Sequence, residues 1–441
     1  MFPKGPLAIP PLQAPLDIVW SVPGSKSITN RALVLAAIAD GTSTLSGVLA
    51  SDDTEHMRRS LTALGVAVED LDQTTLRVTG GRQHLHAPAE PLFVGNSGTT
   101  VRFLTALSCL VQGSVRLEGD QHMAARPIVD LVQGLEQLGV KIDCPSGCPP
   151  LTVHGATLPG GHVSMRGDRS SQYFSALLMA GAAADQRLEL EVLGELVSRP
   201  YVEITLAMMQ AFGGSARATP GGFLVEPTGG YRASDYGVEP DASSASYAFA
   251  AALASGGSVT VNGLGTQSLQ GDYRFTDVLE QVGARVERGA RTTTVSASGP
   301  LRGVDVDMHH ISDTVMTLAA LAPILEGPTT IRNVANIRIK ETDRLAATVA
   351  ELKRLGQEVT HGDDWLKIVP RPVMPATVRS YSDHRMAMSF AILGLAKPGI
   401  AIEDPACVAK TYPGFWDSLR ECYSTQGLDD PFRSVTRKQA H

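Results

Sequence analysis

The segment Leu61-Thr62-Ala63-Leu64-Gly65 is the first of five related pentapeptides that divide this chain into units of similar length. Each has two apolar residues three positions apart, followed by glycine. The spacings between successive glycines are 74, 74, 70 and 73 residues, and a period of this kind indicates a repeat architecture. The 441 residues hold about six such units, with a weaker sixth match at Gly427. The five pentapeptides end at Gly65, Gly139, Gly213, Gly283 and Gly356.

Each unit repeats one order of segments. A strand-like run of β-branched or alternating residues comes first, and a short polar loop leads from it into an amphipathic helix that ends at the pentapeptide. The glycine there can take the left-handed conformation that terminates a helix. A further strand follows in most units, as at 66–68 and 140–142. The leading strands are predicted at 43–48, 114–118, 188–193, 258–262, 329–334 and 400–403.

Every unit also contains a second helix that is rich in alanine and apolar on nearly all sides. Such a helix is buried on every face, so we expect helices packed inside sheets. Six units around one core would exceed the size at which single cores stop growing, about 250 to 300 residues. The units therefore divide three and three near Glu239-Pro240, with residues 1–23 rejoining the second half. The buried helices are predicted at 31–39, 100–111, 172–183, 246–254, 314–325 and 385–395.

The composition is that of an ordinary globular protein, with 43% hydrophobic and 19% charged residues and a net charge of -7. No apolar run reaches the ~18 to 20 residues that cross a bilayer, and the acidic balance argues against a nucleic-acid surface. The Pro-interrupted residues 1–20 lack the features of a targeting segment, so a cytoplasmic protein is expected. The five cysteines, including Cys144 and Cys148, show no zinc spacing, and no metal is expected.

Polar strings precede all of the buried helices. Read alone, each supplies ordinary helix caps, since Ser, Asn and Asp accept hydrogen bonds from the first N–H groups of a helix. Read together, they put helix N-termini at equivalent points of the repeat, and such ends bind phosphate and carboxylate. We therefore expect an anion site. The strings are Gly24-Ser25-Lys26-Ser27, Gly95-Asn96-Ser97-Gly98-Thr99, Asp168-Arg169-Ser170-Ser171-Gln172, Asp241-Ala242-Ser243-Ser244, His310-Ile311-Ser312-Asp313 and Ser382-Asp383-His384-Arg385.

The loops before the amphipathic helices carry a second set of functional groups, at Arg126, Ser198, Lys340 and Lys410. For residues 338–344 the alternative interpretation is a solvated, salt-bridged helix start, because acidic side chains there favour the helix dipole. A scaffold alone would not need such varied groups at one stage of the repeat, which favours one composite site. No Ser-His-Asp, P-loop or GxGxxG arrangement appears in a supporting context, which disfavours hydrolases and nucleotide kinases.

Together these strings closely resemble the 5-enolpyruvylshikimate-3-phosphate synthase family, from about residue 16 to 420 and in all six units. The resemblance implies an α/β fold of two domains, each an inside-out α/β barrel of three βαβαββ units. Residues 24–239 would form the first domain and residues 1–23 plus 240–441 the second, with the active site in the cleft between them. The matching motifs are Val22-Pro23-Gly24-Ser25-Lys26-Ser27 with Asn30-Arg31, Gly95-Asn96-Ser97-Gly98-Thr99-Thr100 with Arg102, Arg126-Pro127-Ile128, Ser170-Ser171-Gln172, Lys340-Glu341-Thr342-Asp343-Arg344 and Asp383-His384-Arg385-Met386-Ala387-Met388.

The same resemblance implies an activity. It is the transfer of the enolpyruvyl group of phosphoenolpyruvate to the 5-hydroxyl of shikimate 3-phosphate, with release of phosphate, in the shikimate pathway to chorismate and the aromatic amino acids. The family needs neither a metal nor an organic cofactor, so none is expected here. The expected partners are these two small molecules, with no nucleic acid and no membrane, and the expected state is a monomer.

Residue roles carry over from the family to the matching positions. Asp313 is expected to be the base toward the 5-hydroxyl, Glu341 the proton donor to the methylene carbon, and Lys26 a stabiliser of developing charge. The residues expected to contact shikimate 3-phosphate are Lys26, Ser27, Arg31, Ser170, Ser171, Gln172, Ser198, Tyr201, Asp313, Asn336 and Lys340. Those expected to contact phosphoenolpyruvate are Lys26, Asn96, Gly98, Arg126, Gln172, Arg344, Arg385 and Lys410.

The chemistry of these residue types agrees with the implied roles. Two substrates that each carry phosphate and carboxylate repel one another, so several cations and helix N-termini are needed to bind them side by side. Adding an alcohol to an enol ether requires one proton delivered to carbon and one removed from oxygen, which two carboxyl groups in opposite protonation states can do. Because the charges come from both halves of the chain, the site is expected to assemble on closure.

Two alternatives and one departure stand beside this interpretation. UDP-N-acetylglucosamine enolpyruvyl transferases share the fold but typically carry a cysteine before their Arg-Pro, and residues 119–125 contain none. A non-catalytic anion-binding repeat protein is the other alternative. Phe103 stands where many family members have proline, which bears on glyphosate sensitivity rather than on the activity. His384 is either a proton-transfer group or a packing residue.

Overall fold

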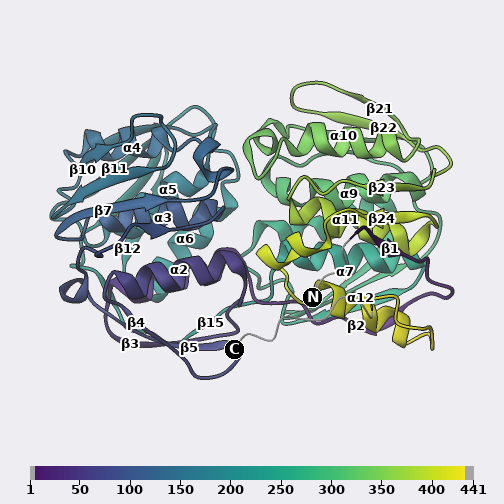
Figure 1. Cartoon of the computed structure of the whole chain (residues 1–441), viewed down its shortest axis with the longest axis horizontal. Helices are drawn as coiled ribbons and strands as arrows, with labels where there is room; N and C mark the ends of the chain where they lie inside the picture. Colours follow the sequence, from purple (N-terminus) through teal and green to yellow (C-terminus); the bar gives the residue numbers. More distant parts are fainter. Residues whose placement is uncertain (1–4, 433–441) are drawn as a thin grey trace. The chain divides into compact units, whose positions relative to one another are not determined.

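The computed structural model describes residues 5–432, which divide into two compact units (Figure 1). One is the contiguous stretch Gly24–Glu239, here called the central unit. The other, here called the split unit, joins the described residues before Gly24 to those from Pro240 onward. Each unit has its own hydrophobic core of buried side chains.

The central unit, described throughout, contains three sheets with strand orders β14-β3-β5-β4, β6-β7-β9-β8 and β10-β11-β13-β12, and β15 also pairs with β3. Its strands are β3 (Ala39–Ser46), β4 (Ala67–Asp70), β5 (Thr75–Gly80), β6 (Leu92–Phe93), β7 (Gly113–Glu118), β8 (Lys141–Asp143), β9 (Leu151–Gly155), β10 (Gly161–Arg166), β11 (Leu188–Leu193), β12 (Ser215–Thr219), β13 (Gly222–Glu226), β14 (Tyr231–Arg232) and β15 (Tyr236–Gly237). Its α-helices are α1 (Lys26–Ile38), α2 (Asp52–Ala63), α3 (Gly98–Ser108), α4 (Val129–Gln137), α5 (Ser171–Gly181) and α6 (Pro200–Ala211), with short 3-10 helices η1 (Arg82–His84) and η2 (Met123–Ala125).

The split unit, in its described residues, has the strand orders β17-β18-β16-β2, β19-β20-β22-β21 and β1-β24-β23. Its strands are β1 (Leu7–Ile9), β2 (Asp17–Val19), β16 (Ser258–Asn262), β17 (Ala284–Arg288), β18 (Thr292–Ala297), β19 (Asp305–Asp307), β20 (Thr329–Arg332), β21 (Glu358–His361), β22 (Leu366–Val369), β23 (Ala376–Val378) and β24 (Ile400–Ile402). Its helices are α7 (Ala242–Ser255), η3 (Gly271–Arg274), α8 (Phe275–Val282), η4 (His309–Thr314), α9 (Val315–Leu321), η5 (Ala322–Ile324), η6 (Ala335–Ile339), α10 (Arg344–Arg354), α11 (His384–Ala396), η7 (Pro405–Lys410) and α12 (Phe415–Ser424).

One pattern builds these sheets. In the β6 sheet, β6 and β7 pair in parallel with α3 between them in the chain, and then α4 leads into the antiparallel strands β8 and β9. The β10 and β19 sheets repeat this βαβαββ order. The α/β fold of βαβαββ units implied by the family resemblance is therefore confirmed.

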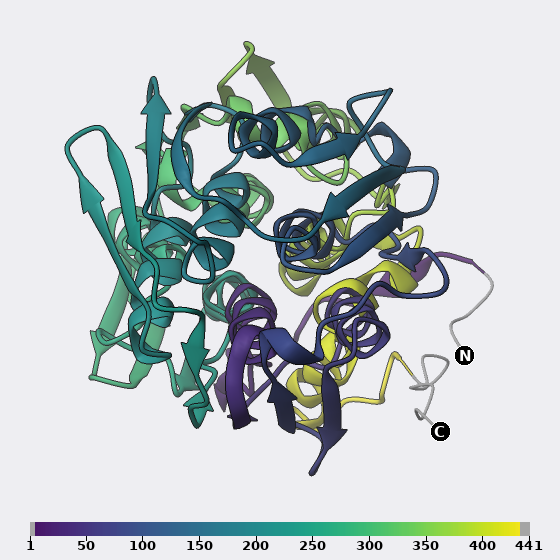
Figure 2. The same ribbon diagram turned by 90° about the vertical axis from the view of Figure 1, so that its left-hand side faces the viewer.

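The alanine-rich helices lie inside, as their sequences predicted. All residues from 28 to 38 of α1 are buried, as are residues 242–253 of α7 and 384–395 of α11. In the central unit α3 packs against α5, and in the split unit α11 packs against α7 and α9. Figure 2 looks onto the central unit, where strands surround the helices.

The sixth unit closes in a way the sequence did not indicate. Helix α12 ends at Ser424, and Gly427 adopts a left-handed φ of 66°, but no strand follows it within the described residues. Instead β1, from the start of the chain, pairs antiparallel with β24 in the register Leu7↔Ile402. The first residues of the chain thus supply the antiparallel neighbour that a hairpin supplies in the other units.

Several predicted bounds were wrong for identifiable reasons. Helix α1 begins at Lys26 and α7 at Ala242, earlier than predicted, because their polar first turns resemble loop. The helix predicted at 314–325 is divided into η4, α9 and η5. Pro323, which has no N–H to donate, lies just after α9 ends.

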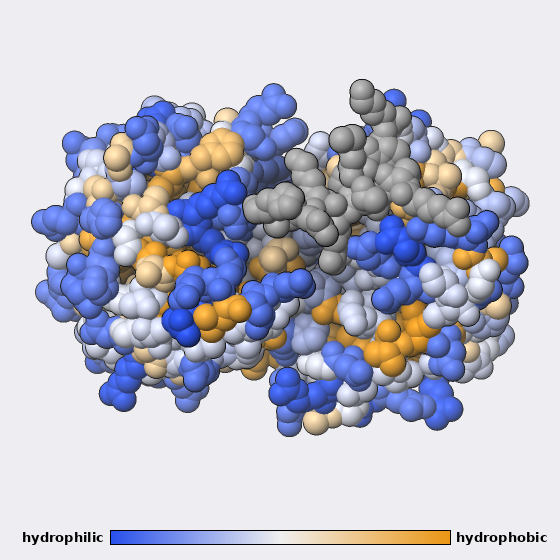
Figure 3. Space-filling view, turned by 60° about the horizontal axis from the view of Figure 1, so that its bottom comes forward, coloured by the Kyte–Doolittle hydropathy of each residue, from blue (hydrophilic) through white to orange (hydrophobic). Residues whose placement is uncertain are grey.

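On the face in Figure 3, polar side chains predominate and apolar ones form separate patches. No described helix has both the length and the apolar character required to cross a membrane.

The left-handed conformation of the glycines that end the amphipathic helices can be tested by substitution. Gly139 has a φ of 83° and open space where a methyl side chain would lie, whereas at Gly65, with a φ of 99°, a methyl group would overlap the His84 carbonyl oxygen. We expect Gly139→Ala to lower the free energy of unfolding by about 1 kcal/mol through backbone conformation alone. Gly65→Ala should lower it by more, because backbone must also shift. Urea unfolding followed by circular dichroism measures both, and equal losses would contradict the assignment.

Candidate active site

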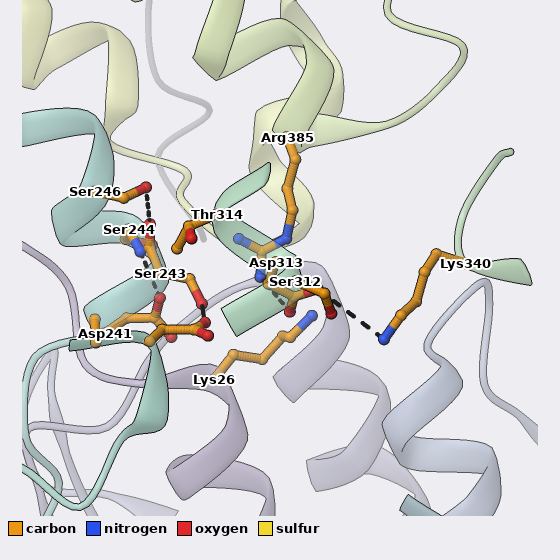
Figure 4. A network of polar contacts seen from close by, with 12 residues as sticks. Lys26, Asp241, Ser243, Ser244, Ser246, Ser312, Asp313, Thr314, Lys340 and Arg385 are labelled. Carbon is orange, nitrogen blue, oxygen red and sulfur yellow. Dashed lines mark hydrogen bonds and ion pairs between the residues drawn. The ribbon is translucent and has the colours of Figure 1, made fainter. Parts of the chain in front are cut away.

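In the split unit the structure brings together charged residues from the starts of three helices, and Figure 4 shows two of them, Asp313 and Arg385. Asp313 lies in η4 at the entry to α9, Arg344 begins α10, and Arg385 is the second residue of α11. Arg344 Nη1 lies 3.2 Å from Asp313 Oδ1, and Arg385 Nη2 lies 2.8 Å from Asp313 Oδ2. The two carboxylate oxygens of Asp313 are thus held by different guanidinium groups.

Arg344 is the most enclosed member of this group, with a side chain only 2% exposed. Its Nη2 lies 2.8 Å from Glu341 Oε2, and its Nε lies 2.7 Å from Asp383 Oδ2. Burial alone would lower the pKa of Arg344, but the negative charges of Asp383, Glu341 and Asp313 outweigh burial and raise that pKa. Arg344 therefore stays a cation in spite of its burial.

For Asp313, burial and neighbouring charge act on the pKa with signs opposite to those for Arg344. Burial alone would raise the pKa of its carboxyl, but Arg385, Lys340 and Arg344 together hold that pKa well below its usual range. The Nζ of Lys340 lies 4.0 Å from Asp313 Oδ1. Asp313 is therefore an ionised carboxylate at neutral pH, which is the form that a base requires.

The remaining predicted residues of the split unit lie in short 3-10 helices. Asn336, in η6, donates from Nδ2 to Ser312 Oγ at 3.0 Å, which ties η6 to the residue preceding Asp313. Lys410 is the last residue of η7. His384 has a side chain with 0% exposure, and its Nδ1 lies 3.6 Å from Asp383 Oδ1, which favours the packing interpretation over direct proton transfer.

In the central unit Lys26 begins α1, and its Nζ lies 3.3 Å from Asp53 Oδ2. Sequence reasoning missed Asp53, which is 3% exposed in the first turn of α2. Asp53 and Arg344 both stand twelve residues before a repeat glycine, Gly65 and Gly356. Alignment of the repeats on these glycines could have found Asp53.

Arg31 is fully enclosed within the central unit. Its Nε donates to Thr205 Oγ1 at 2.8 Å, and Nη2 donates to Ser175 Oγ and the Tyr201 carbonyl, both at 3.0 Å. Its guanidinium also lies 5.2 Å from the centroid of the Phe103 ring. Burial lowers the pKa of Arg31 to about 10, so it remains protonated at neutral pH.

Arg126 is positioned by the loop before α3. Its Nη1 donates to the carbonyl of Asn96 at 3.2 Å and to Asn96 Oδ1 at 3.1 Å. A methyl group at Gly98 would lie 2.5 Å from Arg126 Nη2, so glycine is required for this arrangement. Gln172 joins the same group, because it accepts from Arg102 and donates to Thr99 Oγ1 at 3.2 Å.

The remaining predicted residues of the central unit are serines near the starts of α1, α5 and α6. Ser170 is the N-cap of α5 and accepts from the N–H of Gln172 at 3.3 Å, and Ser171 is the first residue of that helix. Ser198 has a left-handed φ of 51°, which is unfavourable for a residue with a side chain. Ser27 contributes its carbonyl, which accepts from Arg31 Nη1 at 2.8 Å.

The predicted residues therefore fall into two groups, one in each unit. Residues 5–432 contain no cluster of three or more His, Cys, Asp or Glu side chains arranged to hold a metal ion. The fold and these two groups define an α/β repeat protein whose cationic side chains and helix N-termini suit anionic ligands.

Comparison with known proteins identifies the particular family. The family model for EPSP synthase (3-phosphoshikimate 1-carboxyvinyltransferase) matches residues 13–419. A 3-phosphoshikimate 1-carboxyvinyltransferase of Trichormus variabilis is 45% identical over 414 residues, covering 93% of this chain and 97% of its own. One of Serratia proteamaculans is 46% identical over 409 residues, with coverages of 90% and 94%. The solved EPSP synthase of Acinetobacter baumannii superposes with a TM-score of 0.80 at 26% identity, covering 95% and 98%. The chain belongs to the EPSP synthase family.

The buried Arg344–Asp383 pair should contribute far more to stability than a surface pair of the same type. Asp383 is 0% exposed, whereas Asp305 pairs with Arg332 through two oxygens at 55% exposure. We expect Asp383→Asn to lower the free energy of unfolding by about 3–5 kcal/mol, because it leaves a buried guanidinium undercompensated. Asp305→Asn should cost less than about 1 kcal/mol. Similar shifts in the urea midpoints of the two variants would show that Arg344 does not depend on Asp383.

Proposed function

We propose that this chain transfers the enolpyruvyl group of phosphoenolpyruvate to the 5-hydroxyl of shikimate 3-phosphate and releases phosphate. The observation that carries the proposal is the pair of carboxyl groups on Arg344. Asp313 is an ionised carboxylate held between Arg344 and Arg385, and Glu341 pairs with the same Arg344. This arrangement offers two carboxyl groups and several cations, which is what the reaction of two anionic substrates requires. Family membership supports the same activity.

The cations and helix N-termini are proposed to bind the two substrates. Arginine suits the planar carboxylate of phosphoenolpyruvate through paired hydrogen bonds, and lysine acts as a mobile point charge on phosphate. The proposed phosphoenolpyruvate residues are Lys26, Asn96, Gly98, Arg126, Gln172, Arg344, Arg385 and Lys410. The proposed shikimate 3-phosphate residues are Lys26, Ser27, Arg31, Ser170, Ser171, Gln172, Ser198, Tyr201, Asp313, Asn336 and Lys340.

The reaction proceeds by addition and elimination. Asp313 takes the proton of the 5-hydroxyl as that oxygen bonds to C2 of phosphoenolpyruvate. Glu341, once it has taken up a proton, gives that proton to C3, which becomes a methyl group. The tetrahedral intermediate then loses phosphate as its C2–O bond breaks and C3 returns a proton to a carboxylate. Lys26 stabilises the charge that develops on the oxygens.

Substrate binding would also increase the proton affinity of Asp313, the proposed base. In this structure Arg344 and Arg385 both donate hydrogen bonds to Asp313. When the anions of phosphoenolpyruvate share those guanidinium groups, the carboxylate of Asp313 loses part of its compensation and its proton affinity increases. The base thus becomes stronger when a substrate is present.

The activity is tested by measuring phosphate released from phosphoenolpyruvate. We expect release only when shikimate 3-phosphate is supplied. Asp313→Asn and Glu341→Gln should each lower kcat by about 10²–10⁴-fold, because each removes one proton-transfer group. Asp305→Asn, on the surface of the same unit, serves as the control and should leave kcat unchanged.

The same assay separates the alternatives. Release with UDP-N-acetylglucosamine in place of shikimate 3-phosphate would identify the sister transferase. Binding of both anions without any release, and no effect of the two carboxyl variants, would indicate a non-catalytic anion-binding protein. That the chain acts as a cytoplasmic monomer stays a prediction.

We further propose that residues of both units act on one pair of substrates. The proposal rests on chemistry, since cationic side chains and helix N-termini of the same kinds occur in each unit. Shikimate 3-phosphate should then draw the units together, and X-ray scattering should show a smaller radius of gyration when it is added. An unchanged radius, with binding verified by calorimetry, would contradict this closure.

A further inference from the structure

The loop that leads into α11 has an unusual backbone. Tyr381 and Ser382 are consecutive residues with left-handed φ values of 55° each, although neither is glycine. Among residues 5–432, Ser198 and Asn333 are the other non-glycine positions with positive φ. Such conformations persist only where surrounding contacts enforce them, and they concentrate at functional sites. Contacts with neighbouring residues must therefore stabilise the backbone conformation of this loop.

Glu351 provides those contacts from α10. Its side chain has 0% exposure. Oε1 accepts from the Tyr381 hydroxyl at 2.7 Å, and Oε2 accepts from the backbone N–H of Arg379 at 3.0 Å and from Arg354 Nε at 2.9 Å. A buried carboxylate is costly unless it is paired and hydrogen-bonded, and this one is satisfied largely by the loop.

The repeat shows that the scaffold itself does not require a carboxylate here. Glu351 stands five residues before Gly356, and the equivalent positions of the other amphipathic helices are buried and uncharged. They are Ser60, Gly134, Met208, Val278 and Cys422. Packing at this position is thus achieved by small or apolar residues elsewhere, and the charge on Glu351 needs a different explanation.

That explanation is the position of Glu351 relative to Arg344. The two residues are seven apart on α10, two turns along one face of the helix. Arg344 binds Asp383 at the end of the loop, while Glu351 binds the preceding residues. Asp383 in turn caps α11 by accepting from the N–H of Arg385 at 2.9 Å, and Arg385 reaches Asp313. One face of α10 therefore fixes both ends of the loop that orients Arg385.

We propose that Glu351 and Tyr381 are positioning residues for the phosphoenolpyruvate-binding arginines. They touch neither reacting group. They hold the strained 381–382 turn so that Asp383 meets Arg344 and Arg385 points to Asp313. This inference rests on the proposed function for its kinetic consequence, but its structural part can be measured without any substrate.

The kinetic test uses Tyr381→Phe, which removes only the hydroxyl, and Glu351→Gln, which keeps the shape and removes the charge. We expect each to raise KM for phosphoenolpyruvate by about three- to tenfold, the effect of losing one or two hydrogen bonds. KM for shikimate 3-phosphate should change by less than about twofold, because neither Arg344 nor Arg385 is among its proposed contacts. Adding Ser382→Gly to Tyr381→Phe should recover part of the loss, since glycine adopts positive φ without steric cost.

The control is Tyr423→Phe, which removes another tyrosine hydroxyl of the same unit, one that donates to the backbone carbonyl of Pro10 instead of to a carboxylate. It should lower thermal stability without changing KM for phosphoenolpyruvate. The proposal is overturned if Tyr381→Phe and Glu351→Gln leave that KM within twofold of the wild type, if Tyr423→Phe raises it equally, or if Ser382→Gly gives no recovery.

A second measurement keeps this proposal separate from the proposed function. Hydrogen exchange of the protein without substrates reports the Arg385 amide, which donates to Asp383. We expect Tyr381→Phe to speed that exchange about three- to tenfold and Tyr423→Phe to leave it unchanged. If the wild type shows no turnover, the proposed function fails and this exchange result alone decides the positioning role; unchanged exchange in Tyr381→Phe rejects it.

Discussion

The guanidinium of Arg344 is almost fully buried, and the arrangement of the charged group in the split unit follows from that fact. A buried cation is tolerated only among close anions, and here Asp383, Glu341 and Asp313 surround it. Asp383 belongs to the start of α11 and Asp313 to the entry of α9, so compensating one charge joins the ends of three helices. The ion pairs that compensate the buried charge are therefore the same contacts that hold the three helix ends together.

The repeat explains why such different residues can occupy equivalent places. Apolar positions of each helix face the core, whereas one position in the first turn of the amphipathic helices carries residues of different kinds. Twelve residues before the repeat glycine stand Asp53, Tyr201 and Arg344 in three of the units. Each contributes to a polar group in the structure, through its side chain or its carbonyl.

Periodicity predicted much of the fold, including β11 and β16 with their observed bounds at 188–193 and 258–262. It failed where the deciding contact lies far away in sequence. Glu351 is one carboxylate on an ordinary amphipathic helix, and its meaning comes from Tyr381, thirty residues later. The pairing of β1 with β24 joins residues nearly 400 apart. Family motifs named most of the candidate residues, but the contacts that hold them were visible only in three dimensions.

The pairing of β1 with β24 also bears on how the chain acquires its structure. The central unit is one continuous stretch, Gly24–Glu239, and all its strands pair within that stretch. It can fold while the ribosome is still adding the residues that follow, since domains generally fold as units during synthesis. The split unit cannot, because β24 is made nearly 400 residues after its partner β1. Until β24 has been made, β1 is an unpaired strand edge, so the central unit is expected to form first.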